Sequence, residues 1–210
     1  MWETIKIMIG PSGLILLGAI LVAIGGFWAS VKNSHSQKKI VELNNIIASS
    51  ITGGDSFCFL ALSTLDSGPQ KDNPMLIVLQ QGRFPVYDVS IRIKDQDKIE
   101  AVMKAESNWK DGLMVEHLNQ DSIEIKPGVC PPETAAMWGR LPLGTGNNRR
   151  FEVEIAARNG LLHQQIRCKR VKGHWKIASR VTRNIGATGE IIYERIDQEF
   201  PRNVKGQIEW

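Results

Sequence analysis

The chain has 210 residues, a formal net charge of +4 and three cysteines. It contains no low-complexity tract and no internal repeat, which excludes a repeat protein. The cysteines Cys58, Cys130 and Cys168 are odd in number and form no C-x-x-C motif. This pattern favours unpaired buried thiols in a reducing compartment, and one disulfide with a spare thiol is the alternative.

The first element is an apolar stretch, Ile7–Val31, which holds 25 residues and no charged side chain. As a helix it would reach ~37 Å, enough to cross a hydrocarbon core of ~30 Å. Trp2 and Trp28 lie near its two ends, where indole rings favour the membrane interfaces. Because no clean small-residue cleavage pattern follows, we expect residues 1–31 to be an uncleaved transmembrane anchor.

Positive charges flank this stretch unequally. The N-terminal side carries Lys6 and the α-amine against Glu3, and the other side carries three lysines before the first acid. These are Lys32, Lys38 and Lys39. Since the side richer in lysine stays in the cytoplasm, the domain that follows is predicted to be cytoplasmic. The two sides differ by only two lysines, so a periplasmic domain is the alternative.

Residues 32–54 are predicted to form a stalk. A polar exit from the bilayer leads to Ser34-x-x-Gln37, which has the spacing of a capping box, and a helix is expected over Lys38–Ile51. Its apolar stripe consists of Ile40, Leu43, Ile47 and Ile51. This stripe is shorter than two heptads, so it predicts either weak self-association or a helix packed against the domain. Gly53 and Gly54 are expected to end the helix.

From Ser56 onward the apolar period changes from that of a helix to that of a strand. Strands are expected over Phe57–Leu62, Met75–Leu79, Val86–Ile93 and Ser122–Ile125. A short helix is expected over Asp95–Lys104, and a turn over Gly128–Pro132. Asn108–Gln120 gives no clear pattern.

The last third predicts a three-stranded antiparallel meander over Phe151–Val181, with one apolar and one basic face. Asn159-Gly160 is expected to supply the two positive-φ positions of the first hairpin turn, and Lys172-Gly173 the second hairpin. Seven to nine short strands with little helix between them favour a mainly β domain. The predicted fold is a transmembrane helix and a stalk helix, followed by an immunoglobulin-like β-sandwich over 55–199 and a tail over 200–210.

Three stretches resemble a group of uncharacterised bacterial single-pass membrane proteins. They are Ile51-Thr52-Gly53-Gly54-Asp55-Ser56-Phe57-Cys58, Phe84-Pro85-Val86-Tyr87-Asp88-Val89, and the ending from Phe200-Pro201-Arg202-Asn203 to Trp210. The resemblance implies a bacterial inner-membrane protein with a β-rich head. It implies no activity.

The charge is distributed unevenly along the domain. Val41–Glu133 has 14 acids and 8 bases, a net of −6, whereas Arg149–Arg183 has 10 bases and 2 acids, a net of +8. The candidate contact residues are Arg167, Lys169, Lys172, Lys176, Arg180 and Arg183. Aromatic residues do not alternate with these bases, so nucleic acid is not expected. An acidic lipid or protein surface is preferred, and a merely solvated strand face is the alternative.

Each candidate motif for catalysis or metal binding lacks residues that its chemistry requires. Gly54-Asp55-Ser56-Phe57 is similar to the nucleophile block of Gly-Asp-Ser-Leu hydrolases, but no histidine follows an aspartate in an Asp-x-x-His pair. Cys168 and His174 would supply two of the three or four ligands that zinc needs. We therefore predict no catalytic residue, cofactor or metal. The predicted function is an interaction or sensor module, and a membrane-tethered hydrolase with an unrecognised active site is the alternative.

Overall fold

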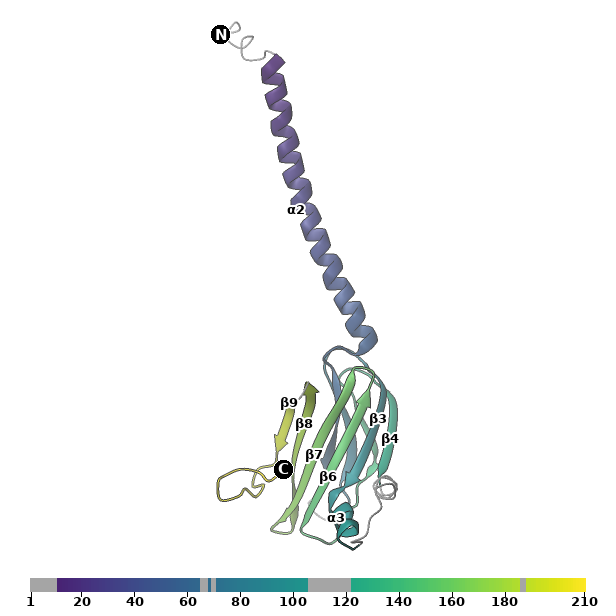
Figure 1. Cartoon of the computed structure of the whole chain (residues 1–210). Coiled ribbons are helices and arrows are strands. Elements are labelled where there is room, and N and C mark those ends of the chain that lie inside the picture. The colour runs from purple at the N-terminus through teal and green to yellow at the C-terminus, as the bar shows by residue number, and fades with distance from the viewer. Residues whose placement is uncertain (1–10, 65–67, 69–70, 106–121, 186–187) are drawn as a thin grey trace. The chain divides into compact units, whose positions relative to one another are not determined.

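The computed structural model describes residues 11–64, 68, 71–105, 122–185 and 188–210 (Figure 1). The chain consists of two compact units, residues 1–48 and residues 49–210. It is mainly β, with one long apolar helix near the N-terminus. The helices are α2 (Pro11–Thr52) and α3 (Gln96–Ala105). The strands are β1 (Phe57–Ser63), β2 (Met75–Gln81), β3 (Val86–Asp95), β4 (Ile123–Cys130), β5 (Ala135–Arg140), β6 (Asn148–Ala157), β7 (Gly160–Val171), β8 (His174–Ile185) and β9 (Thr188–Ile196).

Helix α2 is long and apolar enough to cross a membrane. The predicted polar interruption before Lys38 is wrong, because α2 continues through it to Thr52. The hydroxyl of Ser36 donates to the carbonyl of Lys32 at 3.1 Å, one turn back, so these polar side chains are accommodated within the helix. No glycine or proline occurs between Gly26 and Gly53, so nothing in this part of the chain breaks the helix. The predicted anchor and stalk are therefore parts of one helix.

The domain after the helix is built from two antiparallel sheets. The smaller sheet has the order β1-β2-β5, and the larger has the order β4-β3-β6-β7-β8-β9, whose members lie side by side in Figure 1. Alternate side chains of β3 and β6 are buried, and they share one apolar core with β1 and β2. The buried side chains of β3 and β6 are Val86, Val89, Ile91, Ile93, Phe151, Val153 and Ile155. The two sheets thus cover each other with their apolar faces.

The structure confirms the predicted strands β1, β2 and β3 and the helix α3. The turn predicted over 128–132 is wrong, because Gly128 and Cys130 belong to β4 and pair with Val89 and Val86 of β3. Strand β4 contains Pro127 and Gly128, which it can accommodate because it lies at the edge of its sheet and its pairing with β3 is bulged. Strand β5 was not predicted, since all six of its residues are exposed and give no alternation. The stretch 108–120 lies outside the described residues.

The predicted meander is confirmed as β6, β7 and β8. Lys172 and Gly173 form the second hairpin turn with φ values of 52° and 85°. The first turn is displaced by one residue, because Ala157 pairs with Gly160 and leaves Arg158 and Asn159 as the loop. Of the two residues predicted to have positive φ there, Gly160 does, at 132°, and Asn159 does not. Here the side chain of Asn159 is used for hydrogen bonds to the chain after α2.

Replacing Gly160 by valine should destabilise this hairpin by about 1–3 kcal/mol, because a β-branched residue tolerates positive φ poorly. A Cβ atom at Gly160 would meet no described atom within 4 Å, so backbone strain alone causes the loss. Thermal unfolding measures it. The matched control is Gly146→Val, in a loop where the glycine has no positive φ and its Cβ would lie 3.8 Å from the nearest atom. Equal melting temperatures for the two variants would contradict the prediction.

Candidate interaction surface

Four of the six predicted contact residues lie on one face of the larger sheet, the face turned away from the core. Arg167 and Lys169 come from β7, and Lys176 and Arg180 from β8. They alternate along these strands with the buried side chains of Ile166, Cys168, Ile177 and Ser179. Lys169 and Lys176 are direct cross-strand partners. The structure therefore brings four cations together, and two of them repel each other unless an anion or ring lies nearby.

The other two predicted residues lie elsewhere. Lys172 is in the turn between β7 and β8, and its side chain is 79% exposed. Arg183 pairs with Leu162, whose side chain is buried in the core, so it does not continue the row of outward-facing residues. Its Nη1 lies 3.9 Å from the carboxylate of Asp55, just after α2. Arg183 thus belongs to the end of the domain that follows the helix.

Arg167 is buried, with 5% of its surface exposed. Its Nη2 donates to Oε1 of Glu152 at 3.0 Å, and Nη1 lies 3.4 Å from the carbonyl oxygens of Phe151 and Ile166. A buried ion pair of this kind is strongly destabilising to break, because the remaining charge is left without a partner. Arg167 is therefore a structural residue and is not accessible to a ligand.

The segment after β9, which includes the predicted tail over 200–210, lies on this outward-facing surface. Asp197 binds the backbone of Ile177, accepting from its amide at 2.8 Å and donating to its carbonyl at 2.9 Å. Phe200 is buried, with Lys169 Nζ 5.9 Å from its ring centre. The Arg180 guanidinium lies 4.3 Å from the ring centre of Trp210, so the C-terminus is held beside β8 (Figure 1). Cation–π contacts with two aromatic residues thus occupy two of the cations.

The remaining cations share one anion. The carboxylate of Glu199 lies 3.7 Å from Lys172 Nζ and 3.8 Å from Lys176 Nζ. Exposed ion pairs of this length contribute about 0–1 kcal/mol, so another anion could replace Glu199 at little cost. We name Lys169, Lys172, Lys176 and Arg180 the basic patch. Within it the Lys172 side chain is 79% exposed and that of Lys176 is 28% exposed, whereas aromatic rings lie on Lys169 and Arg180.

The next strands carry charges that neutralise one another. Lys94 Nζ donates to Oε1 of Glu154 at 2.7 Å, and Arg92 lies 4.0 Å from the same carboxylate. The Lys94 hydrogen bond lowers the pKa of Glu154, so this carboxylate remains charged at neutral pH. Counted over their whole lengths, β3 and β6 carry four basic and four acidic side chains, so these strands add no net charge beside the basic patch.

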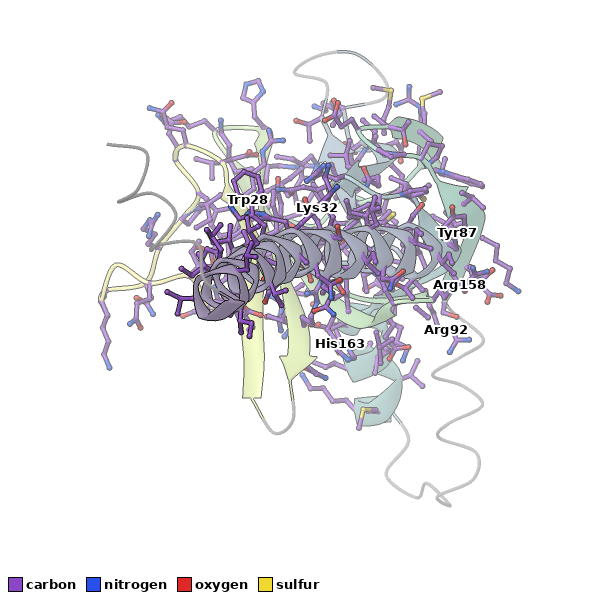
Figure 2. All side chains as sticks on the ribbon, turned by 90° about the horizontal axis from the view of Figure 1, so that it is seen from above. Trp28, Lys32, Tyr87, Arg92, Arg158 and His163 are labelled. Carbon is purple, nitrogen blue, oxygen red and sulfur yellow. The ribbon has the colours of Figure 1, made fainter. Side chains whose placement is uncertain are left out.

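Sequence reasoning missed a clamp between the β6–β7 turn and the end of α2. Arg158 Nε donates to Asp88 at 2.9 Å, and Nη1 donates to the carbonyl of Ile51 at 3.2 Å. The guanidinium also lies 4.9 Å from the ring centre of Tyr87, and both residues are labelled in Figure 2. Asn159 Nδ2 donates to the carbonyl of Gly54 at 3.2 Å. The Asn159-Gly160 turn signal was visible in the sequence, but the contacts of Arg158 with residue 51 and of Asn159 with residue 54 were not.

The block that is similar to hydrolases is structural in this chain. Ser56 is 2% exposed, and its hydroxyl accepts from the amide of Phe84 at 2.9 Å. A Cβ at Gly82 would lie 2.4 Å from this hydroxyl, so the turn before β3 packs directly on it. Gly53 donates to the carbonyl of Ser49 at 2.8 Å with a φ of 94°, which confirms the predicted helix end.

A surface hollow of about 170 Å³ lies near the start of α3. Two of its three charged groups, Arg149 and Asp95, are occupied with each other, since Arg149 Nη2 lies 3.6 Å from the carboxylate of Asp95, and the third is Lys98. Arg149 Nε also donates to the carbonyl of Leu143 at 2.8 Å, and Asp95 accepts from the amides of Asp97 and Lys98. The hollow is smaller than the ~300–1,000 Å³ of ordinary ligand pockets. We therefore interpret Asp95 and Arg149 as groups that cap the start of α3 and not as parts of a substrate site.

All three cysteines are free and buried, as predicted. In the part of the chain that the structure describes, no three His, Cys, Asp or Glu side chains lie close enough to hold a metal ion. Comparisons with protein families, curated proteins and solved structures find no match to this chain. What the chain does must therefore be inferred from its own residues.

Proposed function

We propose that this chain is a single-pass membrane protein whose β-sandwich head is an interaction module for an acidic surface. The observation that carries the proposal is the pairing of a long apolar helix with a folded head that has its own core. The basic patch is the proposed contact, and an acidic lipid surface is the proposed partner. The resemblance to bacterial single-pass membrane proteins supports the same arrangement in the inner membrane of a bacterium.

The arrangement of charge supports a weak, exchangeable contact. Lys172 protrudes from the β7–β8 turn, and Lys176 lies beside it on β8. Only Glu199 competes for these two lysines among the described ion pairs. An anionic headgroup that displaced Glu199 would gain two ammonium partners, and each lysine near such a surface contributes about 1 kcal/mol.

An immunoglobulin-like arrangement of the sandwich is part of the proposal. Strand β5 belongs to the smaller sheet, whereas β4 and β6, its neighbours in sequence, belong to the larger one. Consecutive strands that change sheet are typical of such sandwiches. Strands β6 to β9 are four successive neighbours in one sheet, which is a longer run than in an immunoglobulin domain. The proposed likeness is therefore to the sandwich type and not to the exact strand order.

A soluble chain from Lys38 to Trp210 should bind vesicles of acidic lipid at low salt and release them as salt rises. Replacing Lys172 and Lys176 by serine should weaken binding about 30-fold, the equivalent of about 2 kcal/mol for two lysines. Vesicle flotation at several salt concentrations measures this. The control replaces Lys104 and Lys126, two exposed lysines outside the patch, and should bind like the wild type. Equal binding to neutral and acidic vesicles would contradict the proposal.

We expect the head to face the cytoplasm, because Lys32, Lys38 and Lys39 follow the apolar stretch. Protease added to spheroplasts should therefore leave the head intact and digest it only after lysis. Replacing these three lysines by glutamine should reduce the protected fraction. Digestion of the wild-type head in intact spheroplasts would place it in the periplasm and contradict the expected orientation.

A further inference from the structure

Two thiols meet where the two sheets face each other. Cys58 belongs to β1 of the smaller sheet, and Cys130 ends β4 of the larger one. Their thiols are close enough for each to shift the pKa of the other, although 71 residues separate them in the chain. Both are buried, with 1% and 6% of their surfaces exposed. The contact therefore lies in the core and links the two halves of the head.

The surrounding backbone holds both thiols in place. Cys58 pairs with Gln80 of β2, and Cys130 pairs with Val86 of β3. Gln80 also binds the chain just after Cys130. Its side-chain Oε1 accepts from the backbone amide of Glu133 at 2.6 Å, and its backbone amide donates to the carbonyl of Thr134 at 3.0 Å. The strand beside Cys58 is thus tied to the turn beside Cys130, which fixes the distance between the two cysteines.

We propose that Cys58 and Cys130 form a redox pair, whose disulfide closes across the two sheets by exchange with a small or protein disulfide such as oxidised glutathione. The Cys130 thiolate attacks one sulfur of oxidised glutathione, which forms a mixed disulfide and releases one glutathione thiolate. The Cys58 thiolate then attacks the Cys130 sulfur, which forms the Cys58–Cys130 bond and releases the second. The two protein thiols are oxidised, and their two protons pass to the two reduced glutathiones.

The order of the two attacks follows from the contact between the thiols. The hydrogen bond from Cys58 lowers the pKa of Cys130, because it stabilises the Cys130 thiolate, and the same contact raises the pKa of Cys58. Cys130 is also the more exposed of the two and lies next to a turn. Cys130 is therefore the thiol that meets the external disulfide.

The third cysteine is a control within the same chain. Cys168 is fully buried in β7, and burial raises its pKa to about 12, so its thiol stays protonated. An oxidant that joins only neighbouring cysteines should therefore leave Cys168 as a free thiol. A disulfide between residues 58 and 130 closes a long loop and should raise the melting temperature by about 10 °C.

The test uses the full chain in detergent, incubated with oxidised glutathione and then alkylated and digested. Mass spectrometry should find the Cys58 peptide joined to the Cys130 peptide and Cys168 alkylated. The melting temperature should rise on oxidation and return on reduction. Cys168→Ala should behave like the wild type, whereas Cys58→Ala and Cys130→Ala should show no such rise.

Two results would overturn the proposal. One is that all three thiols of the folded chain remain free, and are therefore alkylated, while the urea-unfolded chain forms disulfides in the same buffer. The other is a disulfide that includes Cys168. Because both readouts come from the wild-type chain, they hold even if a cysteine variant fails to fold.

Discussion

Replacing Gln164 by leucine is expected to lower the free energy of unfolding of the head by about 4 kcal/mol. Gln164 of β7 is fully buried and joins the two sheets through its side-chain amide. Its Oε1 accepts from the amide of Leu60 at 2.8 Å, and its Nε2 donates to the carbonyl of Leu60 at 2.6 Å and to the hydroxyl of Ser179 at 2.8 Å. Leucine fills the space but leaves these groups of β1 buried without partners, at about 1–3 kcal/mol each.

Urea and thermal unfolding measure this loss. The matched control is Gln165→Leu, because Gln165 is the next residue of the same strand and points to the outward face. It exchanges hydrogen bonds with Glu152 and Arg180 at partly buried positions, so its loss should cost about 1 kcal/mol. Equal losses of unfolding free energy for the two variants would contradict the prediction, because the link between the sheets would then stabilise the head no more than a hydrogen bond on the outward face.

The second large effect concerns the membrane. The full chain should stay in membranes through carbonate extraction, and Leu17→Arg combined with Leu21→Arg should release it. Both leucines lie in the middle of the charge-free stretch, and each arginine near the centre of a transmembrane helix costs about 2.5–3.5 kcal/mol. Membrane and soluble fractions are compared by immunoblot.

The control moves the same pair of substitutions along α2. Leu43→Arg with Ile47→Arg keeps the spacing but lies in the part of the helix beyond the apolar stretch, so retention should be unchanged. Release of the wild-type chain would contradict the anchor, and so would a mature N-terminus near Ser30. Equal release of both double variants would show that the apolar stretch is not special.

The sequence by itself determined the elements that carry a local signal. The charge-free run predicted the apolar helix, a short apolar run predicted β1, and period-two alternation predicted β3 and the β6–β8 meander. Lys172-Gly173 predicted its turn, because glycine adopts the positive φ of a tight hairpin without a Cβ penalty. Where the signal was absent or ambiguous, prediction failed. Strand β5 is exposed on every residue, and the second half of the edge strand β4 was predicted as a turn over Gly128–Pro132.

Only the tertiary structure decided which side chains meet. Six cations were candidates by sequence, but burial beside Glu152 removes Arg167 from the surface, and packing of Phe200 and Trp210 places aromatic rings on Lys169 and Arg180. Likewise, Cys58 and Cys130 are unremarkable in sequence and touch in the core. Such contacts depend on how two sheets are laid on each other, and strand periodicity fixes only which face of each sheet is apolar.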